Sequence, residues 1–160
     1  MNNLLNNEPV KRAQEALKKF DNSIKIKVLE KTARTAQDAS IALSCEVGAI
    51  VKSLLFRAEN SFILCLVSGD KKCSLNKLKK ITQKNDLCMA SPEQVKTQTG
   101  YTIGGVSPVG LLKNVEIFMD NTLKRFDKLY AAAGHPNCIF QIDFDKLNKI
   151  TSSKVMEITE

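Results

Sequence analysis

One charged side chain stands inside an otherwise apolar part of the sequence. Lys52 interrupts the run 50–56, which is rich in Ile, Val, Leu and Phe. If side chains alternate as in a strand, the face that carries Lys52 also carries Leu54 and Phe56, so it is not a polar face. A desolvated ammonium group needs an anionic partner, and a carboxylate or a phosphate would serve. The alternative is an edge strand that leaves Lys52 in water.

A glycine-rich loop is the second candidate for chemistry. The segment 102–110 contains three of the seven glycines and one of the four prolines, namely Gly104, Gly105, Gly110 and Pro108. Where Cβ atoms are missing, backbone N–H groups can point into one concavity and hold a carbonyl oxygen or a developing oxyanion. The alternative is a connecting loop with two tight turns.

The other reactive side chains lack partners in the sequence. His135 is the only histidine and precedes Pro136, so it is either a solvent-facing turn residue or a general base. Ser53 and Ser107 are possible nucleophiles, but no sequence neighbour supplies a base. Motifs for phosphate loops, zinc helices, nucleophile elbows and dinucleotides are all missing. The five cysteines lack Cys-x-x-Cys spacing, and we expect buried free thiols without a metal site.

Composition limits the class of protein. The chain has 160 residues, 43% of them hydrophobic, which fits one globular domain. The formal charge of +7 favours a polyanionic partner such as nucleic acid, although it is also compatible with a role in solubility alone. No apolar run approaches the ~20 residues that cross a bilayer. Residues 1–9, which we expect to be flexible, do not resemble a secretion signal, so we expect a cytoplasmic protein.

Short helices and short strands must position these residues. Periodicity and capping residues predict helices at 10–20, 35–47, 75–81 and 92–99, and a last helix that starts at 143 or 145 and contains 150. Strands are expected at 24–28, 50–57, 62–68, 86–90, 115–119, 129–133, 138–142 and 155–158. Because strands and helices do not alternate regularly, we expect a single α+β domain over residues 1–160, built on a mixed, mostly antiparallel sheet.

Four ordered blocks resemble motifs of the YbaK/ProX aminoacyl-tRNA editing family. The first, 35–39, reads Thr-Ala-Gln-Asp-Ala and is similar to the family's Thr-Ala-Glu-Glu-Ala. The others are 49–54 with Lys52, the Gly-x-x-x-Pro loop at 104–108, and 131–134 with the Phe and Leu of 140–147. Val109-Gly110 stands where members often have Phe-Gly. The resemblance runs from about Val10 to the C-terminus.

This resemblance implies a curved sheet surrounded by short helices, and a hydrolase. Members remove a small wrong amino acid, such as Ala, Cys or Ser/Thr, from mischarged tRNA, commonly tRNA for proline. The implied partners are the 3′-terminal aminoacyl-adenosine of such a tRNA, in trans, and prolyl-tRNA synthetase, with no metal, cofactor or membrane. The alternative is a non-catalytic tRNA- or synthetase-binding module of the same fold.

The resemblance also implies roles for particular residues. Lys52 corresponds to a lysine that engages the phosphate and sugar of the terminal adenosine. The loop formed by Gly104, Gly105, Val106, Ser107 and Pro108 corresponds to the segment that holds the aminoacyl carbonyl. An aminoacyl ester is already activated, so positioned water and a vicinal ribose hydroxyl, or the thiol of a Cys substrate, can replace a side-chain base.

Four further residues are expected to contact the substrate. They are Phe56, Gly110, Gly134 and His135. The His135-Pro136 pair is similar to the turn of members that clear Ala, which implies that His135 lines the amino-acid pocket. Phe56 is suited either to stacking on a base or to packing in the core.

Overall fold

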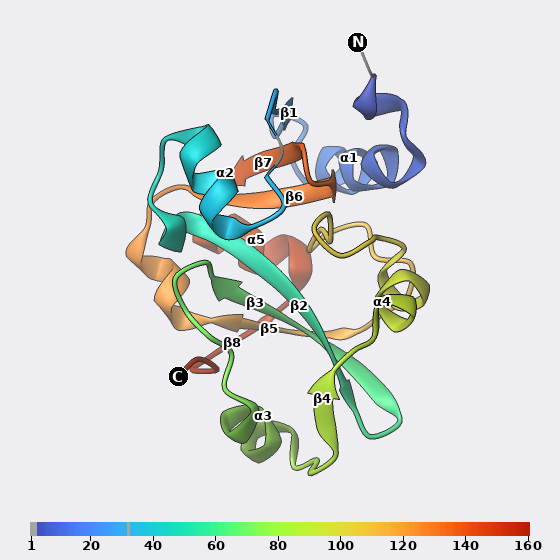
Figure 1. Cartoon of the computed structure of the whole chain (residues 1–160), viewed down its shortest axis with the longest axis vertical. Helices are drawn as coiled ribbons and strands as arrows, with labels where there is room; N and C mark the ends of the chain where they lie inside the picture. Colours follow the sequence, from blue (N-terminus) through green and yellow to red (C-terminus); the bar gives the residue numbers. More distant parts are fainter. Residues whose placement is uncertain (1–2, 32) are drawn as a thin grey trace.

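One curled sheet of eight strands forms the centre of the structure, a computed structural model that describes residues 3–31 and 33–160 (Figure 1). The strands are β1 (Ile26–Val28), β2 (Ile50–Ala58), β3 (Ser61–Ser68), β4 (Leu87–Met89), β5 (Glu116–Asp120), β6 (Leu129–His135), β7 (Cys138–Ile142) and β8 (Lys154–Met156). The α-helices are α1 (Glu8–Phe20), α2 (Ala36–Leu43), α3 (Leu75–Thr82), α4 (Pro92–Thr99) and α5 (Phe144–Thr151). Short 3-10 helices are η1 (Leu4–Asn6), η2 (Val47–Ala49) and η3 (Asn121–Arg125). None of the helices in the described part is long and apolar enough to cross a membrane.

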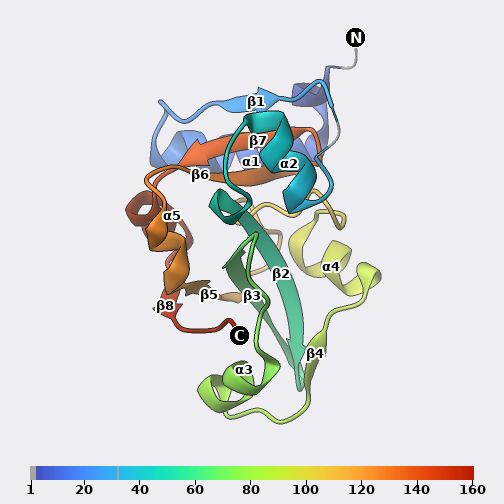
Figure 2. The same ribbon diagram turned by 60° about the vertical axis from the view of Figure 1, so that its left-hand side comes forward.

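The strand order confirms the predicted class of sheet. Neighbouring strands follow the order β1-β7-β6-β2-β3-β5-β8, and β4 pairs with β2 outside this path. Four pairs are antiparallel, namely β1–β7, β6–β7, β2–β3 and β2–β4. Three pairs are parallel, namely β2–β6, β3–β5 and β5–β8. The fold is therefore α+β with a mixed, mostly antiparallel sheet, and the short helices lie around it (Figure 2).

The hairpin of β2 and β3 runs through the middle of the sheet. Its pairing extends from Val51 opposite Ser68 to Ala58 opposite Ser61. Glu59 has φ +55° at the turn, because two-residue hairpin loops favour positive φ at their central positions. β3 is buried along most of its length, as expected for a strand that is covered on both faces. The predicted hairpin is confirmed.

Helices begin at their predicted capping residues. The Thr35 side chain accepts the N–H of Asp38 at 3.0 Å before α2, and Ser91 and Gln94 form a reciprocal capping box before α4. Asp143 caps α5 in the same way. Each cap pairs an N–H of the first turn that has no partner within the helix. α2 ends at Leu43 and not at residue 47, because the chain leaves the helix at Ser44 with φ +53°.

The described part of the N-terminal segment contains helical residues. Leu4–Asn6 form η1, and α1 already begins at Glu8 with a proline in its first turn. Leu4 and Leu5 pack, partly buried, against the main core. The flexibility expected for residues 1–9 stays a prediction. Residues 1–2 lie outside the described part of the chain.

Asp120 ties the C-terminal segment to the end of β5. Its side chain is fully buried and accepts the N–H of Ile158 at 2.8 Å and the hydroxyl of Thr159 at 3.2 Å. Thr122 donates to the same carboxylate through its N–H and its hydroxyl. Loss of the carboxylate would leave these buried donors unpaired, which costs free energy.

We predict that Asp120→Ala lowers the free energy of unfolding by about 3 kcal/mol or more. Urea unfolding measures this as a lower midpoint with an unchanged m value. Asp127→Ala is the matched control, because Asp127 is exposed and its side chain makes no hydrogen bond within the described residues. The control should change stability by less than about 0.5 kcal/mol. Equal stabilities of the two variants would contradict the role of Asp120.

Candidate functional site

One edge of β2 is left open between two partner strands. β2 pairs with β6 only at Ile50 and Val51, and pairing with β4 begins only at Phe56. β6 loses its own register after Ala132, where a bulge interrupts its pairing with β7. Bulges bend strands and end regular pairing. Residues 52–54 therefore have no strand beside them on this edge.

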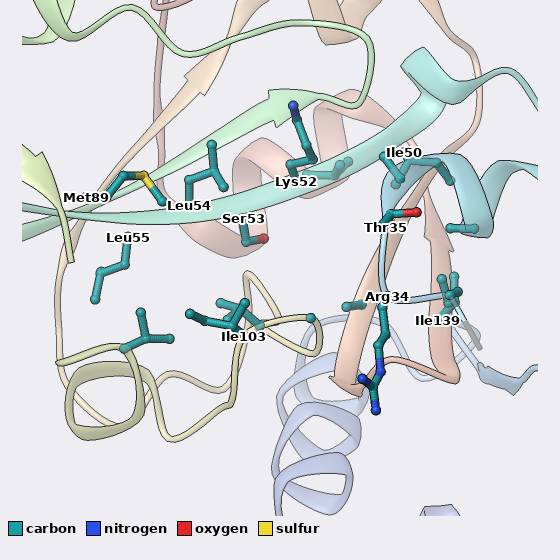
Figure 3. Close-up of a pocket in the computed structure, with 18 of the residues that line it drawn as sticks. Arg34, Thr35, Ile50, Lys52, Ser53, Leu54, Leu55, Met89, Ile103 and Ile139 are labelled. Atoms are coloured by element: carbon teal, nitrogen blue, oxygen red, sulfur yellow. The ribbon is translucent and has the colours of Figure 1, made fainter. Parts of the chain in front are cut away.

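A cavity of about 340 Å³ occupies this opening (Figure 3). Its walls come from the start of α2, from β2, β4 and α4, from the loop at 103–106, and from single residues of β6 and β7. The side chains of Ile50, Lys52 and Leu54 line it on one face of β2, and those of Val51, Ser53 and Leu55 on the other. Figure 3 shows Lys52 and Ser53 on opposite sides of the strand. The cavity thus passes along the open edge from one face to the other.

The lining is mostly apolar and contains no acidic side chain. Ala90, Val95, Val106 and Ile139 are among its apolar members. The polar side chains are those of Arg34, Thr35, Lys52 and Ser53. Within the described residues no Asp, Glu or His lines the cavity. The site can therefore supply cationic and hydroxyl groups, together with backbone N–H groups, but no side-chain carboxylate or imidazole.

Lys52 is half-buried on the face predicted for it. Its Nζ donates to the backbone carbonyl of Lys71 at 2.7 Å. Burial lowers the pKa of Lys52, while the charges of Cys73 and Asp70 oppose this effect. Asp70 itself is paired with Arg125 at 2.8 Å. The partner of Lys52 in the protein is thus a neutral carbonyl and not the anion that the sequence suggested.

Ser53 carries an unpaired hydroxyl. Its Oγ is buried and is the only such side-chain N or O atom without a hydrogen-bond partner in the described part of the chain. The sequence suggested Ser53 only as a nucleophile without a base. Alternation with Val51 and Leu55 would have placed it on the other face from Lys52. This alternation along β2 was the sequence feature that could have indicated the position of Ser53 at the cavity.

The first half of the glycine loop forms one wall of the cavity. Gly104, with φ +96°, and Val106 line it. Gly105 lies behind them: it accepts the N–H of Gly134 at 3.1 Å, and a Cβ atom on it would approach the backbone of His135 to 2.9 Å. The absence of a side chain at Gly105 thus lets the loop dock on the end of β6.

The second half of the loop is an anchor and does not line the cavity. The Tyr101 hydroxyl, which is fully buried, donates to the carbonyl of Val109 at 2.6 Å and reaches that of Gly110 at 3.2 Å. Arg12 lies over the Tyr101 ring, 4.6 Å from its centroid, and donates from Nε to Gly110 at 2.7 Å. Ser107 is buried as well, and its Oγ accepts the N–H of Val109. Sequence reasoning missed Tyr101 as an anchor, because its partners Arg12 and Gly110 lie in other segments of the chain.

The structure brings together some of the predicted residues and separates others. Lys52, Gly104 and Val106 share the cavity, whereas Gly105, Ser107 and Pro108 support its wall from behind. Of the predicted substrate contacts, none lines the cavity: Phe56, Gly110, Gly134, His135. These four predicted contacts therefore lie outside the cavity.

The four non-lining residues have structural surroundings. Phe56 is 2% exposed in a core cluster with Ile63 and Leu87. A Cβ atom on Gly134 would approach the backbone of Pro9 to 2.8 Å. His135 Nδ1 accepts the N–H of Asn137 at 3.0 Å within the turn. The structure therefore gives no direct support to the predicted substrate contacts.

The cysteines are free thiols but not all are buried. Cys65 and Cys138 are buried, Cys45 and Cys73 are partly buried, and Cys88 is exposed. Cys88 lies on β4, where Arg57 reaches its sulfur at 3.3 Å. The expectation of burial is thus wrong for Cys88. In residues 3–31 and 33–160 no group of three or more His, Cys, Asp or Glu side chains could hold a metal ion.

Comparisons with known proteins show which family and which individual proteins this chain is similar to. Residues 30–150 match a family described as aminoacyl-tRNA editing domain. The chain is 35% identical over 127 residues to the uncharacterized protein YwhH of Bacillus subtilis, which covers 79% of this chain and 80% of that protein. It is 32% identical over 119 residues to a proline–tRNA ligase of Caldicellulosiruptor saccharolyticus, covering 74% of this chain but 18% of the ligase. The crystal structure of a proposed trans-editing enzyme for prolyl-tRNA synthetase has a TM-score of 0.91 at 34% identity, over 96% of this chain and 98% of that one.

We predict that Tyr101→Phe lowers stability by about 1–2 kcal/mol at neutral pH, because the buried carbonyl of Val109 loses its donor, whereas the carbonyl of Gly110 keeps that of Arg12. Burial raises the pKa of Tyr101 to about 12. An unfolded tyrosine loses its proton near pH 10, so the folded state holds more protons between pH 10 and 12 and its stability falls there as pH rises. The phenylalanine variant has no hydroxyl to titrate, so its stability does not fall for this reason. The difference in free energy of unfolding between the wild type and the variant should therefore shrink by up to about 2–3 kcal/mol from pH 10 to pH 12.

Urea unfolding at pH 7, 10 and 12 measures this difference. Charges common to both proteins cancel in the comparison. Tyr130→Phe removes the other tyrosine hydroxyl, which makes no hydrogen bond in the described part of the chain, and serves as the control for loss of a tyrosine hydroxyl. A pH-independent gap for Tyr101→Phe would contradict the buried anchor.

Proposed function

The chain belongs to the aminoacyl-tRNA editing domain family, as the four sequence blocks indicate, and we propose that it is a deacylase acting on mischarged tRNA in trans. In this proposal it hydrolyses the ester between a small wrong amino acid, such as Ala, Cys or Ser/Thr, and the 3′-terminal adenosine. The tRNA is most simply that for proline, because the chain resembles part of proline–tRNA ligases and a proposed trans-editing enzyme for prolyl-tRNA synthetase. The synthetase is a candidate partner on the same grounds.

The observation that carries the proposal is the small cavity beside the open edge of β2. Its volume of about 340 Å³ lies at the small end of ligand sites, which span about 300–1,000 Å³. An acyl group with a short side chain fits a cavity of this size better than a whole nucleotide does. The apolar walls of the cavity suit such a side chain. Because the cavity extends along β2, the proposal places the nucleotide at the end of the cavity near Lys52.

The glycine loop is suited to hold the ester carbonyl. Gly104 and Val106 line the cavity, and neither N–H donates to another group of the described residues. Free N–H groups in a fixed loop can stabilise a developing oxyanion, each worth about 3 kcal/mol in the transition state. Water adds to the carbonyl carbon, the bond from that carbon to the ribose oxygen breaks, and the ribose oxygen takes a proton. Positioning then supplies most of the catalysis.

Lys52 is assigned to the phosphate and sugar end. An ammonium group has three donors, so Lys52 can keep its bond to the Lys71 carbonyl and still bind a phosphate oxygen. Arg34 is exposed at the same cavity and adds a second positive charge. Phosphate contacts of this kind give affinity that depends on salt.

One observation favours a different function, a non-catalytic module that binds tRNA or a synthetase. Within the described lining no Asp, Glu or His side chain is available to act as a general base. Such a module would protect the ester, whereas a deacylase would cleave it. Incubating the protein with a panel of aminoacylated tRNAs therefore separates the two functions, and unchanged or slower loss of every ester would overturn the proposal.

We predict that Lys52→Ala lowers deacylation by at least about 100-fold, because it removes the charge that positions the terminal nucleotide. The rate of loss of a labelled amino acid from mischarged tRNA measures the effect. Thermal unfolding should show a retained fold. The matched control is Lys80→Ala, an exposed lysine of α3 outside the cavity, which should alter the rate only slightly. Wild-type turnover in Lys52→Ala would sink the role assigned to this lysine.

A further inference from the structure

The hydroxyl of Ser53 has no hydrogen-bond partner in the described part of the chain. Its Oγ is buried at the cavity and has no partner, although buried polar groups in folded proteins are nearly always hydrogen-bonded. An unpaired group of this kind costs stability, and a ligand that pairs it recovers that cost on binding. The mechanism described above does not employ Ser53.

The backbone of Ser53 faces the same opening. On this edge of β2 the carbonyl of Leu55 accepts the N–H of Ala90 at 3.0 Å, whereas the carbonyl of Ile50 accepts from Gly69 at the β3 side. Peptide groups along a strand alternate between its two edges. Ser53, two residues before Leu55, therefore directs its N–H and C=O to the edge where residues 52–54 have no strand partner.

We infer that Ser53 binds the α-amino group of the aminoacyl ester, through its hydroxyl oxygen and its backbone carbonyl. This inference rests on the proposed function and names the group that orients the acyl part. An α-ammonium has three N–H donors and needs acceptors. No carboxylate lines the described cavity, and the Ser53 hydroxyl has no partner among the described residues, so the neutral oxygens of Ser53 are acceptors that an ammonium group can use.

Ser53 is a positioning and specificity residue here, not a nucleophile. A serine attacks an ester only when a base takes its proton, and the described residues of the lining include no histidine or carboxylate. Lys52, its sequence neighbour, points to the opposite face of β2 (Figure 3). The hydroxyl can accept a hydrogen bond without any base, which agrees with these surroundings.

The test compares esters with and without the amine. tRNA for proline carries either the amino acid that the wild type clears fastest or the same acid without its amino group, for example alanyl and propionyl. The ratio of kcat/KM for the two esters should fall about ten-fold or more in Ser53→Ala, because a hydrogen bond to a charged group is lost. Differences in intrinsic ester reactivity are the same for every variant and cancel. Ser53→Thr keeps the hydroxyl and should keep the wild-type ratio.

Two further variants guard the comparison. Ser53→Cys preserves the size of the side chain but offers only a weak acceptor, and should reproduce the loss if Ser53→Ala unfolds. Ser23→Ala, an exposed serine outside the cavity, should not change the ratio. The urea midpoint of Ser53→Ala should equal or exceed that of the wild type, since no hydrogen bond is removed.

The outcomes separate this inference from the proposed function. If the wild type clears no aminoacyl ester, the proposed function fails and this inference fails with it. If the wild type is active and Ser53→Ala keeps its ratio, or slows both esters equally, the inference alone is overturned. A fall in the ratio that threonine prevents supports it.

Discussion

The interruption of pairing along one edge of β2 is the constraint on which the rest of the site depends. A nine-residue strand that pairs with β3 over nearly its whole length is held rigidly on one side. On its other side it meets β6 at its start and β4 at its end, and the peptide groups between them need other partners or a ligand. Sheets twist, so two partner strands that reach one edge from different directions readily leave such an interval. The opening is therefore a product of topology and not of a flexible loop.

The walls beside this opening are held by contacts that involve distant parts of the chain. α1 supplies Arg12, which stacks on Tyr101 and bonds to Gly110, so the N-terminal helix fixes a loop almost a hundred residues later. Gly105 docks on the end of β6, where its carbonyl accepts the N–H of Gly134. A site that works by positioning requires such support, because a loosely held N–H group loses most of its advantage over water. Rigidity of the glycine loop thus comes from packing around it, while glycine supplies only the close approach.

Local information in the sequence was sufficient to predict most elements and part of the cavity lining. The capping residues Thr35, Ser91 and Asp143 act within one turn, so their helices could be predicted. Lys52 and Gly104 were found because a lysine in an apolar strand and clustered glycines are unusual in themselves. Phe56, Gly110 and His135 could not be placed, since which side of a strand, loop or turn faces a cavity depends on elements far away in sequence. The pairing of the three-residue strand β4 with β2 is one such contact between segments that are distant in sequence.

The two faces of β2 suggest how affinity and selectivity can be divided in this family member. At the Lys52 end of the cavity, the ammonium group offers a positive charge, which would attract any tRNA end and would not distinguish amino acids. At the other end, apolar walls can discriminate by size, but one methylene is worth only ~1–3 kcal/mol. A hydrogen-bonding group discriminates more sharply than an apolar wall, because a mismatched ligand leaves it unpaired. In the deacylase proposed above, the unpaired hydroxyl of Ser53 is therefore better explained as a group that recognises the substrate than as a defect of packing.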